Sequence, residues 1–213
     1  MATLRVNPTR MELTRIKRRL VTAKRGHKLL KDKRDALVRR FIALVRENAA
    51  LRRRVEESLP QALRRFALAS AVMEGTALEG ALLYPARKAE VFIGTKNILS
   101  VRVPTVSLNE EGLGDTVRPY GYAETSVELD EAISTMADLL PDLLKLAEVE
   151  KSCNLLADEI EKTRRRVNAL EYVMIPQFEE TIRVISMKLD ENERSSVVRL
   201  MKVKEMISQE AEQ

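Results

Sequence analysis

The stretch from Leu13 to Val55, LTRIKRRLVTAKRGHKLLKDKRDALVRRFIALVRENAALRRRV, decides the fold. Counted from Leu13 in alternating steps of three and four, ten of thirteen positions are apolar. This spacing is typical of a helix that presents one narrow seam to a partner helix in a left-handed coiled coil. The three polar exceptions, His27, Arg34 and Asn48, are interpreted as residues that fix helix register.

A second stretch near the C-terminus repeats the pattern. From Leu146 to Met174 seven of nine seam positions are hydrophobic, and apolar residues recur as far as Ile207. We therefore expect the second helix to run nearly to the C-terminus. Pro176 lies within the pattern, and because the apolar stripe continues beyond it, we predict a helix kink there and not a helix end.

Glycine and proline separate the chain of 213 residues into three segments. There are only seven of each, and six of the seven glycines lie between residues 75 and 121. We expect an N-terminal coiled-coil helix in residues 1–60, a middle region in 61–145 and a C-terminal coiled-coil helix in 146–213. The predicted fold class is mainly α: a long antiparallel two-helix coiled coil with a small middle region that carries short helices and a β-hairpin.

Two seams in one chain are most simply satisfied by each other. In the predicted register, residue i faces a residue near 213 − i, so that position 44 lies opposite position 170. The residues assigned to the seam are Leu13, Ile16, Leu20, Leu30, Leu37, Phe41, Leu44, Leu51, Leu156, Ile160, Val167, Leu170 and Met174.

The middle region is predicted in more detail from shorter patterns. Residues 62–78 and 129–146 have helical spacing, with Pro60 and Pro141 placed to start or bend the helices. Residues 89–93 and 98–103 are β-branched runs that predict a hairpin with its turn at 94–97. Residues 107–123 are expected to form a loop.

Motifs for catalysis or cofactor binding are lacking in the sequence. The single cysteine, Cys153, and the single histidine, His27, cannot form a zinc set. Gly94-Thr-Lys96 lacks the flanking residues of a phosphate-binding loop, and Gly112-Leu-Gly114 lacks those of a dinucleotide site. We expect no catalytic residue, cofactor or metal, and no membrane-spanning segment. The absence of paired cysteines favours a cytoplasmic location.

Charge is spread unevenly along the chain. Residues 1–70 have a net charge of +14, residues 71–140 of −6 and residues 141–213 of −3, which gives +5 in total. Arginines occur all around the helix and stacking aromatics are scarce, so a nucleic-acid interface is disfavoured. From the residues alone, a cytosolic coiled-coil scaffold and a basic nucleic-acid-binding protein stay open as alternatives.

Both arms carry motifs of a known family. Asn7–Leu13 (NPTRMEL), Gly26–Leu37 (GHKLLKDKRDAL), Lys162–Glu171 (KTRRRVNALE), Val173–Pro176 (VMIP) and Leu189–Arg194 (LDENER) occur in the order and spacing of the D subunits of the V-type and A-type rotary ATPases. The sequence resembles that family over both arms, and over the middle third only in character.

The resemblance implies the central rotor shaft, a non-catalytic component of an ATPase or ATP synthase that is peripheral to the membrane. It implies as partners the A and B subunits of the ATP-hydrolysing ring, the F subunit, and the funnel-shaped subunit (called C or d) above the membrane ring. Basic residues near both chain ends are then candidates for contacts with acidic loops of the A/B ring. They are Arg10, Lys17, Arg18, Arg19, Lys31, Lys33, Arg34, Arg165, Arg166, Arg199 and Lys202.

Overall fold

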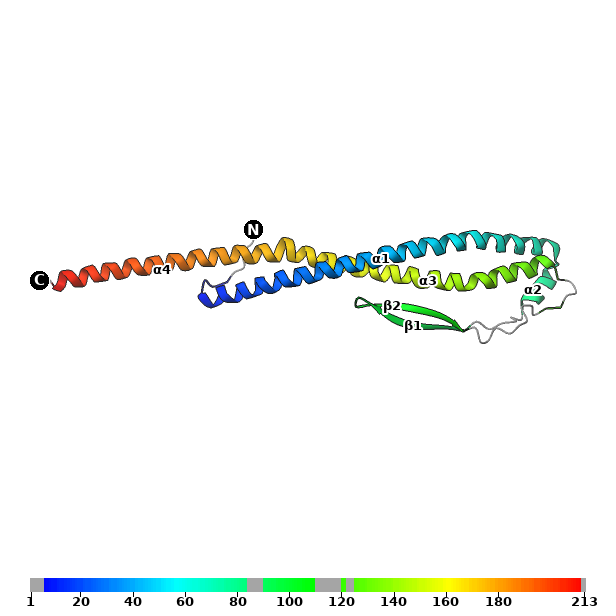
Figure 1. The fold of residues 1–213 in the computed structure, drawn as a ribbon, viewed down its shortest axis with the longest axis horizontal. Helices are drawn as coiled ribbons and strands as arrows, with labels where there is room; N and C mark the ends of the chain where they lie inside the picture. Colours follow the sequence, from blue (N-terminus) through cyan, green and yellow to red (C-terminus); the bar gives the residue numbers. More distant parts are fainter. Residues whose placement is uncertain (1–5, 84–89, 110–119, 122–124, 212–213) are drawn as a thin grey trace. The chain divides into compact units, whose positions relative to one another are not determined.

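The computed structural model describes residues 6–83, 90–109, 120–121 and 125–211. Its elements are helices α1 (Arg10–Val72) and α2 (Gly75–Leu83), strands β1 (Glu90–Ile98) and β2 (Val101–Asn109), helix α3 (Val127–Asn168), the π-helical turn η1 (Ala169–Met174) and helix α4 (Ile175–Ala211) (Figure 1). The predicted fold class, mainly α with paired long helices and one hairpin, is confirmed.

Two compact units divide the described residues. The first unit combines the residues up to Asp35 with those from Glu161 onward, and the second comprises residues between Ala36 and Ile160. Helices α1 and α3 each contribute to both units, so the boundaries of the units differ in kind from the three segments predicted from the sequence. The three-segment division therefore stays a prediction. Each unit is described below by itself.

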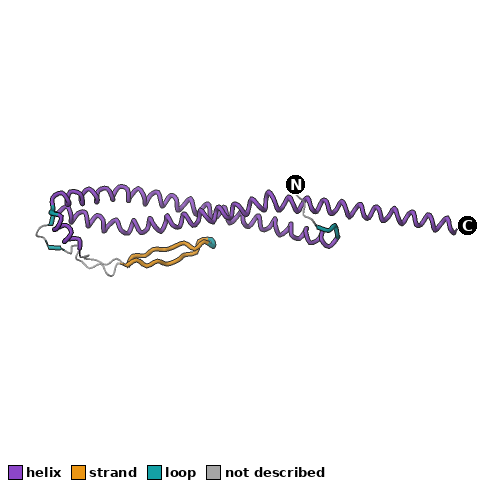
Figure 2. Tube along the Cα trace, turned by 180° about the vertical axis from the view of Figure 1, so that it is seen from behind, coloured by secondary structure: helices purple, strands orange, loops and turns teal. Residues whose placement is uncertain are grey.

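In the second unit, the later part of α1 and most of α3 pack against each other. Leu37, Leu44 and Leu51 of α1 recur every seven residues and therefore share one face, which is buried with Val149 and Leu156 of α3. Val101 and Val103 of β2 complete this core. The hairpin accordingly lies along one side of the helix pair, as both views show (Figures 1 and 2).

The hairpin is antiparallel, and its turn differs from the prediction. Ile98 pairs with Val101, and the turn residues Leu99 and Ser100 have φ values of 50° and 74°. Positive φ at both central residues is typical of the tight two-residue turn whose twist matches that of the strands. The Ser100 N–H donates to Asn97 Oδ1 at 2.9 Å.

The predicted turn at 94–97 is wrong because these residues belong to β1. Gly94 lies opposite Thr105, and a Cβ added at Gly94 would come within 2.7 Å of Thr105 Oγ1. The glycine therefore permits a close side-chain approach between strands and does not mark a turn.

The two short helices predicted beside the prolines are also corrected. Pro60 lies inside α1 and Pro141 inside α3, so both long helices continue past a residue that cannot donate a backbone hydrogen bond. Seam residues buried on both sides of Pro60, Val55 and Ala62, hold the helix together across it. The short helix that does form is α2, whose Ala81 is buried against Ala69 of α1 and Leu129 of α3.

Ion pairs across the second unit show that the helices are antiparallel but that the predicted register is wrong. Glu47 Oε1 lies 3.8 Å from Lys145 Nζ, and Arg65 Nε lies 3.3 Å from Glu131 Oε2. The predicted register placed position 166 opposite position 47. The helices are offset because α1 extends to Val72 before the chain reverses.

The predicted loop at 107–123 is only partly testable. Ser107 and Asn109 belong to β2, which corrects the start of that loop. Residues 110–119 and 122–124, with Gly112 and Gly114, lie outside the described residues.

Candidate interaction surface

The first unit is built on a second apolar core. Ile16 of α1 is buried with Phe178 and Ile185 of α4, and Leu13, Leu20, Ala23, Ile182 and Leu189 pack around them. The α1 members keep the alternating spacing read from the sequence, which places them on one face. The start of α1 is thereby held against α4.

Charged side chains cross between the same two helical segments. Lys24 Nζ lies 2.7 Å from Glu179 Oε1, and Arg10 forms an ion pair with Glu193. Both pairs are exposed, so each contributes at most about 1 kcal/mol to the free energy of unfolding. The ion pairs also report the register of the two helices. The predicted register placed position 189 opposite Lys24, whereas the structure places Glu179 there, so the prediction is wrong by about ten residues in this unit.

The residues assigned to the seam differ in burial. Six are buried: Ile16, Leu37, Leu44, Leu51, Leu156 and Val167. Six are partly buried: Leu13, Leu20, Leu30, Phe41, Ile160 and Leu170. Met174 is exposed, at 41% of its surface.

Met174 is the last residue of the π-helical turn η1, which ends two residues before Pro176. The N–H of Ile175 donates to the carbonyl of Leu170, five residues back, where an α-helix would use the residue four back. The helix then continues as α4, so the expectation that the chain stays helical through Pro176 is met. The distortion lies in the turn before the proline, and a kink stays a prediction.

Beyond Glu193, α4 leaves its partner helix behind. Figure 1 shows the C-terminal end of α4 running past the start of α1. Seven apolar residues of this tail are between 50% and 69% exposed: Val197, Val198, Leu200, Met201, Val203, Met206 and Ile207. The predicted register placed Leu200 opposite Leu13 in the intramolecular seam, whereas the structure leaves this tail uncovered.

All eleven basic candidates lie in the first unit. Arg10, Lys17, Arg18, Arg19, Lys31, Arg165, Arg166, Arg199 and Lys202 are exposed, and Lys33 and Arg34 are partly buried. Several of them interact within the chain: Arg10 pairs with Glu193, Arg165 with Glu161 and Arg34 with Asp35, and Arg199 donates hydrogen bonds to Ser195. Among the described residues, the side chains of Lys17, Arg18 and Arg19 make no ion pair.

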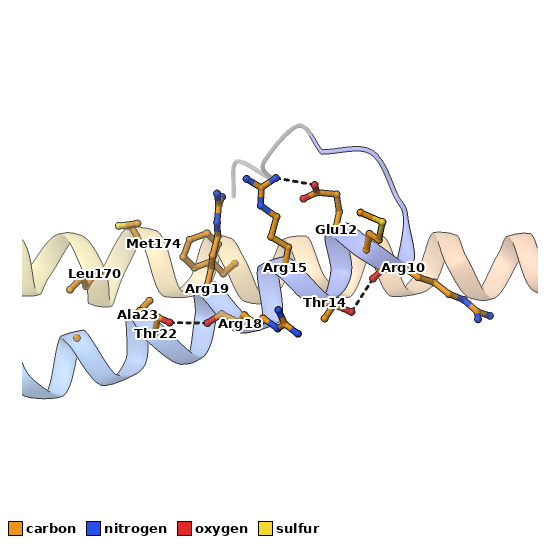
Figure 3. Close-up of a pocket in the computed structure, with 13 residues that line it drawn as sticks. Arg10, Glu12, Thr14, Arg15, Arg18, Arg19, Thr22, Ala23, Leu170 and Met174 are labelled. Atoms are coloured by element: carbon orange, nitrogen blue, oxygen red, sulfur yellow. Dashed lines mark hydrogen bonds and ion pairs between the residues drawn. The ribbon is translucent and has the colours of Figure 1, made fainter.

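An open groove of about 1100 Å³ runs beside these arginines. Figure 3 shows Leu170 and Met174 on the second helix and Ala23 on α1 among the residues that line it. Phe178 also lines it, and the arginines on its α1 side are Arg10, Arg15, Arg18 and Arg19. Arg15 is paired with Glu12 at 3.1 Å. The surface is thus an apolar groove with a positively charged rim.

The polar seam residues differ in the partners that the structure gives them. His27 Nε2 lies 3.2 Å from Glu171 Oε2 across the helix pair. Arg34 instead bonds Asp35, its neighbour on the same helix, and Asn48 is partly buried. Their role in fixing register stays a prediction.

Features of a chemical active site are few in the described part of the chain. No group of three His, Cys, Asp or Glu residues suited to a metal occurs among the described residues. Cys153 is partly buried in the second unit, and its pKa is raised by burial and then by the charges of Glu150 and Glu47. A raised pKa keeps the thiol protonated and poorly nucleophilic.

None of the described helices combines the length and hydropathy needed to cross a bilayer.

These features define a class of protein: a helix pair whose longer member ends in an uncovered apolar tail beside a basic, grooved surface. The chain belongs to the ATP synthase D-subunit family, whose pattern it matches over residues 12–205. It is 58% identical over 214 aligned residues to the V-type ATP synthase D subunit of Clostridium novyi (strain NT), covering 100% of this chain and 99% of the relative.

Other relatives are similar along their whole length. The V-type ATP synthase D subunit of Thermoanaerobacter sp. (strain X514) is 56% identical over 207 residues, with 97% of this chain and 99% of the relative covered. That of Clostridium botulinum (strain Langeland) is 57% identical over 208 residues, with 97% and 96% covered. The resemblance read from the motifs is therefore confirmed.

Sequence reasoning missed two parts of the surface. Arg15 and Met11 line the groove but fall outside the seam and outside the basic clusters of the sequence. The apolar residues of the tail were recognised in the sequence, but they have the same spacing as the seam residues. The sequence pattern alone therefore did not show that no partner helix covers them in the structure.

Proposed function

We propose that this chain is the central-stalk subunit, the rotor shaft, of a V/A-type ATPase or ATP synthase. In this role it couples ATP hydrolysis or synthesis in the ring of A and B subunits to rotation of the membrane ring that translocates ions. The observation that carries the proposal is the match to the D-subunit family over nearly the whole chain.

The tail of α4 suits such a shaft. Seven exposed apolar residues beyond Glu193 are far more than an isolated soluble helix needs, and uncovered apolar patches mark interaction sites. A single helix that projects from a helix pair offers its whole circumference to a surrounding partner. We assign the tail to contacts inside the A/B ring.

The exposed basic residues form the second part of the proposed interface. Lys17, Arg18 and Arg19 are consecutive, so they point in different directions around α1. Charge acts over about 8–10 Å at physiological ionic strength, so these residues can attract acidic loops of the ring as the shaft turns. The other members of the set of eleven are proposed for the same role.

We further propose the F subunit and the funnel-shaped subunit (called C or d) as partners of the second unit. Helix α2 and the adjoining ends of α1 and α3 expose Val72, Leu83 and Val127, which offers a partner an apolar surface. The chain itself would be non-catalytic, since the ATP sites belong to the ring. It would be located at the cytoplasmic face, peripheral to the membrane.

Reconstitution tests the proposal directly. The A/B ring is assembled with and without this chain, and ATP-driven rotation of a probe on the stalk is recorded. We expect rotation only in the presence of the chain. A complex whose funnel-shaped subunit rotates equally well without the chain would refute the proposal.

A charge-neutral variant tests the basic contacts. Substitution of Lys17, Arg18 and Arg19 by glutamine should lower torque and coupled ATP synthesis in the reconstituted complex. The matched control places glutamine at three other exposed arginines, Arg39, Arg53 and Arg64, which lie in the second unit. Equal torque in the variant, the control and the wild type would contradict the assignment of these contacts.

A further inference from the structure

The seam of the second helix contains one residue too many. From Thr163 it follows Val167, Leu170 and Met174 in alternating steps of four and three. Phe178 and Ile182 then follow after two more steps of four, so three consecutive steps of four replace the heptad pattern. A heptad seam with one inserted residue can keep facing its partner only if the helix is locally unwound.

The π-helical turn lies at this insertion. Its hydrogen bond from the Ile175 N–H to the Leu170 carbonyl closes a wider turn than an α-helix has, and the wider turn holds the extra residue. The opposite helix has no such interruption, because α1 keeps alternating steps through Leu13, Ile16, Leu20, Ala23 and His27. One helix of the pair is therefore unwound against a regular partner.

Packing around the turn is weak on both helices. Between Val167 and Phe178 no residue of the second helix is fully buried, and Tyr172, Val173 and Met174 are 70%, 58% and 41% exposed. On α1 no residue between Ile16 and Leu37 is fully buried. The open groove occupies the same place, lined by Leu170 and Met174 (Figure 3). Regions with few buried apolar contacts open at low free-energy cost.

We infer that the π-helical turn is a built-in torsional joint of the second helix. Addition or removal of one residue of a helix rotates everything beyond it by about 100° relative to the seam. The π turn absorbs this rotation, and the weakly packed turns between Val167 and Phe178 can twist while the buried residues on either side keep their places in the core. Its use as a joint under torque rests on the proposed function, whereas its existence in the chain does not.

A single-residue deletion tests the joint in the isolated full-length chain. Deletion of Tyr172 moves Phe178, Ile182, Ile185 and Leu189 into the heptad phase set by Thr163 and Val167, so the π turn is no longer needed. Leu170 and Ile175, which the deletion places four residues apart, should then pack in the seam. We expect the thermal midpoint to rise by about 4 °C or more, the scale of well-packed apolar side chains in a chain of this length. An unchanged or lower midpoint would overturn the inference.

Two control variants make the deletion interpretable. Tyr172→Ala removes the same side chain without changing the helix length and should leave the midpoint unchanged. Deletion of Arg25, which is exposed on the uninterrupted α1, breaks a regular seam and should lower the midpoint. If the Arg25 deletion raised the midpoint as much as the Tyr172 deletion, the extra residue would have no special role.

Hydrogen exchange tests the joint without any substitution. In the wild-type chain the amides of residues 169–175 should exchange faster than those of 163–167 and 182–189. Uniform protection across these segments would overturn the inference.

The role under torque is tested in the assembled complex. The Tyr172 deletion should reduce the angular fluctuation of a probe on the stalk relative to the wild type. Unchanged fluctuation in a complex that still rotates would contradict the joint's role under torque while leaving the proposed function intact. A wild-type chain that never assembles with the ring would count against the proposed function instead.

Discussion

At the scale of single residues, Leu37 and Leu29 show what the seam contributes. Leu37 is fully buried among Leu44, Leu156 and their neighbours, whereas Leu29 is 69% exposed on the same helix. Leu37→Ala should therefore lower the free energy of unfolding by about 2–5 kcal/mol, from lost burial and the cavity left behind. Leu29→Ala should change it by less than about 0.5 kcal/mol. Denaturant unfolding of both variants measures the difference, and equal losses would contradict the assigned seam.

Cys153 is the residue whose chemistry depends most clearly on its surroundings. Burial, and then the negative charges of Glu150 and Glu47, raise its pKa, because each disfavours the thiolate. Alkylation of the thiol should therefore become fast only at a higher pH than for an unperturbed cysteine. Glu150→Gln should lower the pKa and shift the alkylation profile to lower pH. A profile that is the same in both proteins would show that the carboxylate has no effect on the thiol.

At the scale of elements, the hairpin turn carries a local cost. Leu99 and Ser100 both have positive φ, which costs a non-glycine residue roughly 1–2 kcal/mol. Substitution by Asn-Gly, the pair preferred in such turns, should remove most of this cost and slow hydrogen exchange in β1 and β2. Ser100→Ala provides the control, since it keeps the strain. Faster exchange in the Asn-Gly variant would show that the turn is not of this type.

The hairpin also shows where sequence reasoning reached its limit. Two β-branched runs correctly predicted two strands. The turn was predicted at Gly94–Asn97 because glycine and asparagine favour turns, but these residues lie within β1. What places the turn at Leu99 and Ser100 is the pairing of β2 with β1 and its burial against α3. One hydrogen bond joins β2 to α3: the Val106 N–H donates to Glu148 Oε2 at 3.0 Å. Such a contact joins residues far apart in sequence, so no local pattern reveals it.

The long helices were predictable for the opposite reason. Their apolar spacing is local and repeats many times, so α1 and the second helix could be read directly from Leu13 and Leu146 onward. Register was not, because it depends on where the chain reverses, and the seam continues across Pro60 and Pro141 into that region. Similarly, the basic residues of the candidate surface could be found, whereas the groove beside them depends on the π turn before Pro176.

At the scale of the whole molecule, the uncovered tail separates stability from function. Residues 197–207 contribute no buried side chain, so removing the chain after Ser196 should leave the thermal midpoint of the isolated protein within a few degrees of the wild type. In the reconstituted ATPase the same truncation should strongly reduce coupled ATP synthesis, because the apolar residues proposed to contact the ring are lost.

A full-length variant distinguishes the tail's surface from its length. Substitution of Val197, Leu200, Val203 and Ile207 by serine keeps the length of the helix but removes apolar surface. Burial of each of these side chains against the ring would contribute about 1.5–3 kcal/mol to the binding free energy, so loss of even two contacts should weaken binding measurably. We expect this variant to reduce coupled ATP synthesis nearly as much as the truncation does, while the thermal midpoint of the isolated chain stays close to that of the wild type. If it coupled like the wild type, the tail would act through its length and not through apolar contact with the ring.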